Sequence, residues 1–309
     1  MQLVRGLHNL RAKHRGCVAT IGNFDGVHLG HQSVFRHLLE KGAEFNLPTT
    51  VVTFEPQPRE YFQAATAPAR LTRLREKLQA IEALGVQRVV VLEFNRRLAA
   101  MPAEVFVEEL LVKGLGTQFL SVGDDFRFGS GRLGDFELLQ RMGRAHGFEV
   151  ENMNTYKLEK DRVSSTRIRE LLTQGDLKTA AQYLGRPYRI CGRVAHGHKR
   201  GRTIGFPTMN VNLHRRVSPL SGVYAVKVEG LDEGVCPGVA NIGVRPTVEG
   251  DTRYLLEIHL FDFDRSVYGA HVSVEFVQKL RDEQRFENFE ALRQQIFRDA
   301  AAAREILGV

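Results

Sequence analysis

The chain has 309 residues, more than one hydrophobic core usually supports, so two domains are expected. Hydrophobic residues make up 43% and charged residues 26%, which argues against a disordered or fibrous protein, and the net charge of +7 favours anionic ligands. No apolar run approaches the roughly 20 residues of a membrane span, and no signal segment is evident. The three cysteines are far apart in the sequence and match no disulfide or metal-binding pattern. These features predict a cytoplasmic protein that does not bind a membrane.

Residues 1–18 carry four basic and no acidic side chains, and we expect a surface turn or helix there. Beyond them, the first 150 residues alternate between short β-branched runs and segments with a helical apolar period. The runs predict strands at Val18–Ile21, Thr49–Phe54, Arg88–Leu92, Phe119–Val122 and Phe148–Val150. The periodic segments predict helices at Ser33–Phe45, Leu71–Leu84, Ala103–Val112 and Gly134–Gly147. This alternation is typical of an α/β domain with a parallel sheet covered by helices on both faces.

The pattern changes near residue 185. Two short helices, Thr166–Thr173 and Leu177–Tyr183, come before a turn at Leu184–Pro187. Strands then alternate with turns, which favours a barrel or sandwich; they are predicted at Tyr188–Val194, Val223–Val228, Gly238–Ile242, Tyr254–Leu260 and Val272–Val277. An amphipathic helix, Phe289–Leu307, closes the chain. We therefore expect an α/β domain over residues 1–184 and a small β-barrel domain with a C-terminal helix over residues 185–309.

A glycine-rich segment, Gly22–His31, follows the first of these predicted strands directly and leads into a helix. Ligands of open α/β sheets bind beyond the carboxyl ends of strands, where helix N-termini offer N–H groups to phosphate. The three glycines of the segment allow close backbone approach, and His28 and His31, one helical turn apart, can donate hydrogen bonds to a polyphosphate. A metal site is one alternative, although a third ligand is not evident and a helix N-terminus disfavours cations. Packing or capping is the other.

No acidic residue occurs between Asp176 and Glu229, whereas ten basic residues do. Within this stretch, Val194–Asn210 combines glycines and basic side chains with the hydroxyl of Thr208 and the amide of Asn210. That combination favours phosphate binding, although it does not follow the P-loop pattern. A basic surface hairpin is the alternative interpretation.

A second glycine pattern, Gly129–Gly134, fits G-x-G-x-x-G and would suit a dinucleotide-dependent oxidoreductase. It comes late in the domain, however, and a Phe-Arg-Phe run separates it from the preceding strand. We therefore interpret it as a flexible loop.

The segment Gly22–His31 resembles the adenylyltransferase half of the prokaryotic bifunctional riboflavin kinase/FAD synthetase family. Three further blocks are similar to family motifs: Phe54–Pro58 to the flavin-side segment, Val122–Gly129 to G-x-D-F-x-F-G, and Ser164–Arg169 to the S-S-T-x-x-R signature that grips triphosphate. The resemblance implies that the first domain joins FMN to the AMP part of ATP, giving FAD and pyrophosphate.

The resemblance also implies roles for individual residues of this first site. The residues expected to contact the nucleotide are Gly22, Phe24, Asp25, Gly26, Gly30, Ser165 and Thr166. The residues expected to take part in catalysis are His28, His31 and Arg169. The residues expected to contact the flavin in this site are Phe54, Pro56, Pro58, Asp125, Phe126 and Phe128. In the second domain, Arg245 is expected to bind flavin.

The basic segment is similar to the riboflavin kinase loop H-G-x-x-x-G-R-x-x-G-F-P-T-A-N, with Met209 in place of the alanine. Strand alternation is expected to turn Met209 away from Thr208 and Asn210. Two further blocks, Asn241–Thr247 and Glu257–Gly269, also match the family. The resemblance implies transfer of the ATP γ-phosphoryl group to the 5′-hydroxyl of riboflavin, which gives FMN.

In this kinase module the resemblance assigns Mg²⁺ and ATP phosphates to Thr208 and Asn210, and further nucleotide contacts to Gly201 and Gly205. Glu257 is the expected general base, because phosphorylating an alcohol needs a carboxylate near the hydroxyl, and Glu257 stands in an otherwise apolar strand. A solvent-facing strand position is its alternative. Asp262 and Asp264 form a D-x-D pattern that we interpret as a loop.

Two competing functions remain open from the sequence. One is a kinase whose first domain no longer adenylylates. The other is an RNA-binding protein, which is disfavoured because tryptophan is absent and the basic residues cluster at glycine turns rather than among stacking aromatics. We expect ATP, riboflavin and FMN as small-molecule partners, FAD as a product, Mg²⁺ as cofactor, no nucleic acid, and a monomer or weak homo-oligomer.

Overall fold

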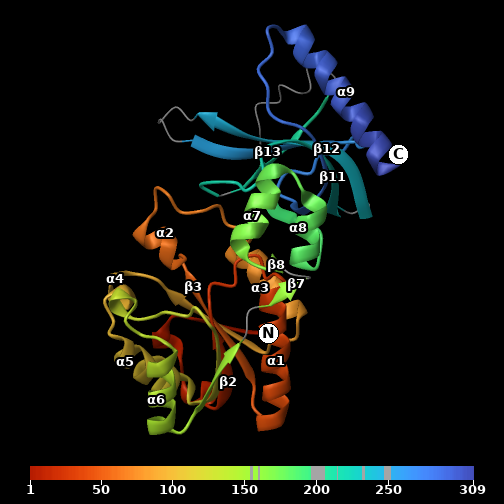
Figure 1. Cartoon of the computed structure of the whole chain (residues 1–309). Helices are drawn as coiled ribbons and strands as arrows, with labels where there is room; N and C mark the ends of the chain where they lie inside the picture. The colour runs from red at the N-terminus through yellow and green to blue at the C-terminus, as the bar shows by residue number, and fades with distance from the viewer. Residues whose placement is uncertain (154–155, 159–160, 196–205, 214, 232–233, 247–251) are drawn as a thin grey trace. The chain divides into compact units, whose positions relative to one another are not determined.

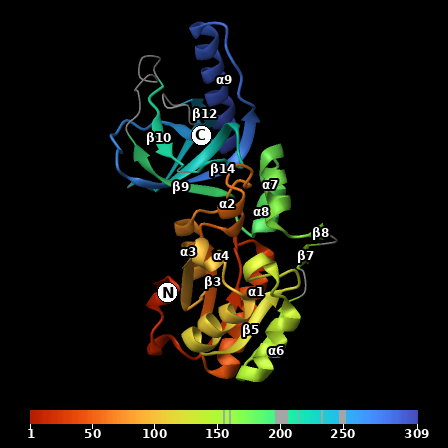
Figure 2. The same cartoon turned by 90° about the vertical axis from the view of Figure 1, so that its left-hand side faces the viewer.

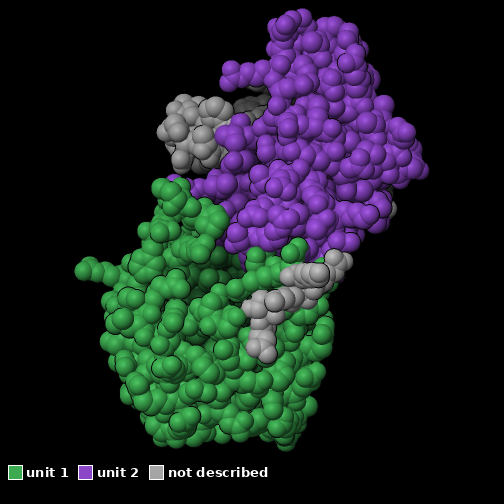
Figure 3. Space-filling model, viewed as in Figure 1, with its two compact units in different colours: residues 1–68, 72–164 green, residues 69–71, 165–309 purple. Residues whose placement is uncertain are grey.

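The computed structural model describes residues 1–153, 156–158, 161–195, 206–213, 215–231, 234–246 and 252–309. It divides into two compact units, shown in different colours in Figure 3. Unit 1 comprises Met1–Pro68 and Thr72–Ser164, and unit 2 comprises Ala69–Leu71 and Ser165–Val309. Within the described ranges, no helix is both long enough and apolar enough to cross a membrane.

Unit 1 is built on a parallel sheet of six strands in the order β1-β4-β3-β2-β5-β6. The strands are β1 (Gln2–Arg5), β2 (Cys17–Ile21), β3 (Thr49–Glu55), β4 (Arg88–Glu93), β5 (Thr117–Gly123) and β6 (Glu149–Met153). Strand β2 pairs with β3 on one side and with β5 on the other, so the strand order reverses its direction at β2. The predicted α/β domain is confirmed.

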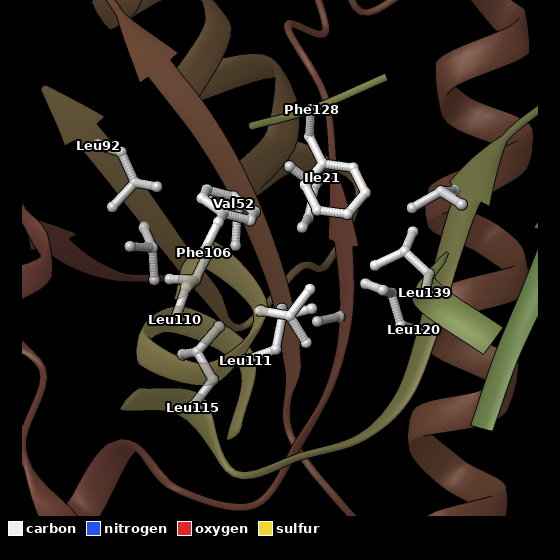
Figure 4. Close-up of a cluster of buried hydrophobic side chains, with 14 of the residues drawn as sticks. Ile21, Val52, Leu92, Phe106, Leu110, Leu111, Leu115, Leu120, Phe128 and Leu139 are labelled. Carbon is white, nitrogen blue, oxygen red and sulfur yellow. The ribbon is translucent and has the colours of Figure 1, made fainter. Parts of the chain in front are cut away.

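Both faces of the sheet are buried under helices (Figure 1). On one face, Val51 packs in a cluster with Phe35 and Ile81 of two covering helices. On the opposite face, Val52 lies in the larger cluster of Figure 4 with Phe106 and Leu110. The helices of unit 1 are α1 (Leu29–Phe45), α2 (Pro58–Phe62), α3 (Leu74–Ala83), α4 (Arg96–Ala99), α5 (Ala103–Phe106), the π-helical η3 (Val107–Leu115) and α6 (Phe136–His146).

Three parts of unit 1 differ from the prediction. Strand β1 occupies residues that were expected to form a turn or helix; only its Val4 is buried, so the segment lacks the apolar run by which the other strands are recognised. Two 3₁₀ turns follow it, at Leu7–Asn9 and Ala12–His14. The helix expected over Ala103–Val112 begins correctly but continues in π-helical form to Leu115. A short hairpin, β7 (Lys157–Leu158) and β8 (Asp161–Arg162), was not predicted.

Unit 2 is a closed antiparallel barrel preceded by two helices and followed by one (Figure 2). The helices are α7 (Ser165–Gln174), α8 (Leu177–Leu184) and α9 (Phe289–Leu307). The barrel order is β10-β13-β12-β11-β14-β9, from β9 (Arg189–Ala195), β10 (Met209–Asn212), β11 (Gly222–Leu231), β12 (Gly234–Pro246), β13 (Thr252–Leu260) and β14 (His271–Arg281). The barrel and the terminal helix are confirmed. Only β10, four residues long, was not predicted as a strand.

Side chains along each strand of the barrel point alternately into the interior and outward. Val211, Leu256 and Ile242 are paired neighbours on three strands and are fully buried in the apolar interior. Ala300 and Ala303 of α9 pack in a second cluster with Val223, Ala225 and Val239. Residues between the interior positions therefore project on the outer face, and α9 covers part of that face.

The segment Ala69–Leu71 belongs to unit 2 although its sequence neighbours belong to unit 1. Tyr188 Oη donates to the Leu71 carbonyl at 3.1 Å, and Arg215 donates to the Arg70 carbonyl at 2.8 Å. The continuous part of unit 2 begins at Ser165, whereas the predicted boundary between residues 184 and 185 stays a prediction.

Candidate active sites

The Gly22–His31 segment leaves the carboxyl end of β2, at the point where the strand order reverses. Ligands of open α/β sheets bind at this position. The backbone turns sharply there, because Phe24 (φ 46°), Gly26 (φ 84°) and Val27 (φ 45°) all adopt left-handed conformations. Such conformations cost about 1–3 kcal/mol for non-glycine residues, so the surrounding structure must hold the turn in place.

His28 and His31 lie together at the start of α1. His28 is the N-cap residue, and its Nδ1 accepts a long hydrogen bond from the His31 backbone N–H at 3.4 Å. The two imidazole rings stack with centroids 3.6 Å apart. An Nδ1 that accepts leaves the ring proton on Nε2, which can then donate to a ligand oxygen. Gly30 permits this packing, since a Cβ there would lie 3.2 Å from the His28 ring.

The other predicted nucleotide residues of this segment shape the loop. The Gly22 N–H donates to the Val52 carbonyl at 3.0 Å, which ties the loop to β3. Phe24 is buried against His31, at 5.2 Å between ring centroids, and against Phe35, at 4.8 Å. Asp25 is only 3% exposed, so its carboxylate points into the protein rather than toward solvent.

The residues predicted to bind flavin follow the two strands that flank β2. Phe54 lies near the end of β3, the exposed Pro56 follows it, and Pro58 opens α2. Phe126 and Phe128 follow β5 and stack at 5.5 Å with an interplanar angle of 16°. Because parallel strands end at one edge of the sheet, these segments border the same edge as the histidine pair. The exposed Asp125 pairs with Arg162 at 3.2 Å.

Sequence reasoning missed three aromatic side chains beside these flavin-side residues. Phe94 contacts Tyr61 at 5.5 Å, Phe62 at 5.6 Å and Phe54 at 5.9 Å between ring centroids. Phe62 is 64% exposed, which is unusual for a large apolar ring. The consecutive aromatics just after Pro58 were the available signal.

Packing accounts for two of the three glycines of the Gly129–Gly134 pattern, and the third, Gly131, has a φ of 64°. A Cβ at Gly129 would lie 2.7 Å from Ala103, and one at Gly134 would lie 2.7 Å from the Phe128 ring. Phe128 and Gly134 also exchange backbone hydrogen bonds of 3.1 and 2.9 Å, which close the segment into a turn. The segment is therefore a loop whose two ends are held by packing, whereas Gly131, Arg132 and Leu133 between them are exposed.

The predicted triphosphate residues lie on α7 in unit 2. Ser165 is half-buried at the start of the helix and Thr166 is exposed. Arg169 is half-buried, and its Nε donates to the Ala69 carbonyl at 2.6 Å. Their action together with the unit 1 histidines stays a prediction.

In the barrel, strand register brings the predicted kinase residues together. Asn210 on β10 is paired with Glu257 on β13, and Glu257 is paired with Asn241 on β12. Directly paired residues project on the same face, so the carboxylate lies between two amides. Asn210 is only 8% exposed, and Glu257, which alternates with the buried Leu256 and Ile258, is half-buried on the outer face of the barrel. Asn241 was part of a recognised sequence block, but only the register reveals its place.

The residues around Asn210 follow the expected alternation. Thr208 is exposed, whereas Met209 is 7% exposed and paired with the fully buried Ile258. Gly201 and Gly205, predicted to contact nucleotide, lie outside the described residues. Arg245 lies on β12 opposite Arg253, and only its backbone is described.

His259 anchors the segment that leads to Thr208. Its Nδ1 donates to the Pro207 carbonyl at 2.9 Å, and its ring packs on Phe206 with centroids 4.7 Å apart. In the adjoining loop, Asp262 forms a two-pronged ion pair with Arg304 of α9, both contacts at 3.0 Å. The D-x-D aspartate therefore holds α9 to this loop, as expected for a structural role.

Acid pH is expected to destabilise unit 2 through His259. Burial lowers the pKa of His259 below its ordinary value of 6.5, so the unfolded chain binds this proton more readily than the folded chain. The free energy of unfolding should therefore fall as pH drops from about 6.5 toward the lowered pKa, and level off below it. Urea titrations of unit 2 fluorescence or exchange signals between pH 7.5 and 5 measure this slope. His259→Phe should flatten it, and an unchanged slope in that variant would contradict the assignment.

Comparison with known proteins matches both halves of the chain. A family model for FAD synthetase matches residues 10–167, and one for riboflavin kinase matches residues 184–307. Proteins described as bifunctional riboflavin kinase/FMN adenylyltransferase are similar along their whole length. The *Haemophilus influenzae* protein is 53% identical over 98% of both chains, and that of *Pseudomonas fluorescens* is 55% identical over 99% of this chain and 98% of its own.

A solved structure has the same overall chain fold. It is that of a *Streptococcus pneumoniae* protein described as a macrolide-efflux protein, with a TM-score of 0.81 and 29% identity. The match covers 98% of this chain and 99% of the pneumococcal one, so the similarity includes both units.

Proposed function

The chain belongs to the bifunctional riboflavin kinase/FMN adenylyltransferase family, and we propose that its two reactions divide between the two sites described above. The enzyme phosphorylates riboflavin with ATP to FMN, and it adenylylates FMN with ATP to FAD and pyrophosphate. We assign the first reaction to the barrel and the second to the sheet edge at β2.

In the kinase site, Glu257 acts as general base. It accepts the proton of the riboflavin 5′-hydroxyl as that oxygen attacks the γ-phosphorus of ATP. Asn210 and Asn241, which flank it, orient the carboxylate and donate hydrogen bonds to it or to phosphate oxygens. The observation that carries this assignment is the strand register that sets Glu257 between the two amides.

In the adenylylation site, the FMN phosphate attacks the α-phosphorus of ATP and pyrophosphate leaves. This nucleophile is already anionic, so the protein needs to position the reactants and stabilise the charge of the transition state rather than remove a proton. His28 and His31 donate from the start of α1, where backbone N–H groups add further donors. Ser165, Thr166 and Arg169 supply hydroxyl and guanidinium donors for the triphosphate.

Magnesium fits the donors of the kinase site. Thr208 offers a hydroxyl, Asn210 an amide oxygen and Glu257 a carboxylate nearby, and oxygen ligands of this kind suit Mg²⁺. Among the residues that the structure describes, no group of three or more His, Cys, Asp or Glu side chains gathers as a metal site. A bound Mg²⁺ would neutralise phosphate charge, with Thr208 and Asn210 as its protein ligands.

We place the enzyme in the cytoplasm, as a monomer or weak homo-oligomer that binds small molecules and no nucleic acid. No disulfide joins Cys17, Cys191 and Cys236, all of which lie in described parts of the chain, and this suits a reducing compartment. The basic excess of the chain then serves nucleotide phosphates.

Incubation of the purified protein with riboflavin and Mg-ATP tests the proposal. Chromatographic separation of flavins over time should show FMN first and then FAD, with pyrophosphate released in step with FAD. Heat-denatured protein is the control. Absence of both flavin products would contradict the function.

A further inference from the structure

We propose that the amino-terminal end of α3 belongs to the adenylylation site, with Thr72 and Lys77 as positioning residues that hold the turn Asn23–Gly26 in its phosphate-binding shape. The inference rests on the proposed assignment of adenylylation to the β2–α1 loop. Neither residue was recognised from the sequence as part of a site, because each lies about fifty positions from the loop that it contacts.

Thr72 holds the end of the turn through its backbone and its side chain. The Gly26 N–H donates to Thr72 Oγ1 at 2.9 Å. The Thr72 N–H and hydroxyl in turn donate to Asp25 Oδ1, at 3.0 and 3.2 Å. All three bonds are buried, and Thr72 itself is 7% exposed. Asp25 and Gly26 therefore depend on Thr72 for their orientation.

Lys77 holds the start of the same turn. Its Nζ donates to the Asn23 carbonyl at 2.6 Å and lies 3.4 Å from Thr53 Oγ1. The side chain is 0% exposed, although burying an ammonium group is costly unless strong partners satisfy it. The Asn23 carbonyl is one such partner. Its hydrogen bond to the Lys77 ammonium group holds the peptide between Asn23 and Phe24 close to α3.

The turn requires such restraint because of its backbone. Phe24 and Val27 are non-glycine residues with positive φ, and the Val27 N–H closes the turn on the Phe24 carbonyl at 3.3 Å. Lys77 fixes the peptide before Phe24, and Thr72 fixes the peptide before Gly26. His28 follows immediately, so a relaxed turn would move the first histidine and the start of α1.

Thr72→Val tests the inference, since it removes the hydroxyl while keeping the shape of the side chain. We expect kcat/KM for ATP in FMN adenylylation to fall by roughly 10–100-fold, the effect of losing one buried hydrogen bond at a site where geometry sets the rate. The KM for FMN should stay within about two-fold, because the loop is assigned to ATP. Thr72→Ser should restore most of the activity. Thr66→Val, at an exposed threonine of unit 1, is the matched control.

Lys77→Met gives a second and independent measurement, with Lys13→Met as its exposed control. It should show the same ATP-specific loss with riboflavin phosphorylation retained. If Lys77→Met does not fold, the comparison of Thr72→Val with Thr72→Ser alone decides.

Adenylylation by Thr72→Val within two-fold of the parent would overturn the inference, as would an equal loss in Thr72→Ser. His28→Ala run in parallel separates the two proposals. If His28→Ala abolishes FAD formation and Thr72→Val does not, only this inference fails; if His28→Ala is fully active, the site assignment itself fails.

Discussion

Replacing Glu257 with glutamine is expected to slow FMN formation by about 10²- to 10⁴-fold, the usual contribution of a positioned general base. FAD formation from added FMN should be unchanged, because that reaction is assigned to the sheet edge at β2 and not to the barrel. Glutamine keeps the size and hydrogen bonding of the side chain, so the flanking amides Asn210 and Asn241 can still pair with it. The loss should therefore appear in kcat rather than in the KM for ATP.

The measurement uses two substrates on one preparation. Initial rates are recorded with riboflavin and Mg-ATP and, separately, with FMN and Mg-ATP. Glu287→Gln, at an exposed carboxylate of unit 2, controls for a general effect of lost charge. Equal loss of both reactions in Glu257→Gln would mean that the division of the reactions between the barrel and the sheet edge at β2 is wrong. A fully active kinase would remove Glu257 as the base.

The strands that could be predicted from sequence are those whose environment is uniform. In β2, β3, β4 and β5 nearly every residue is buried, so each strand contains a run of apolar and β-branched residues that single-sequence reasoning detects. Strand β1 has one buried residue and β10 is four residues long, so neither carries enough pattern to be recognised. Strand β1 is placed by pairing with β4, and β10 by pairing with β13. Both pairings join residues far apart in the sequence, so they cannot be recognised from a local pattern.

The same distinction holds for the sites. Gly22–His31 is contiguous and contains unusual residue types, so its spacing favours phosphate binding and its family resemblance implies the reaction. Glu257 could be singled out because a carboxylate is rare in an apolar strand. Asn241, Thr72 and Lys77 could not, because an ordinary polar residue becomes part of a site only through strand register or through a contact across the fold. Local sequence thus predicts candidates for the reacting groups but not the residues that would hold them in place.

Replacing His28 should produce the opposite pattern to Glu257→Gln. Loss of its donor is expected to lower the rate of FMN adenylylation by about 10²- to 10³-fold, the typical effect of removing one stabilising donor from a transition state. Riboflavin phosphorylation should continue, so FMN should accumulate when riboflavin and Mg-ATP are supplied. Chromatography of the flavins follows this directly.

His28 also caps α1, so two substitutions are needed to separate capping from chemistry. Its Nδ1 accepts from the His31 N–H, and loss of such a cap costs about 0.5–2 kcal/mol of helix stability. Asparagine is among the best N-cap residues, whereas alanine is a poor one. If the role is only structural, His28→Asn should retain FAD formation while His28→Ala loses it. If the imidazole stabilises the transition state, both variants should be impaired alike although only His28→Ala has a lower melting temperature. His146→Asn, at an exposed histidine of α6, should behave as the parent enzyme in both assays.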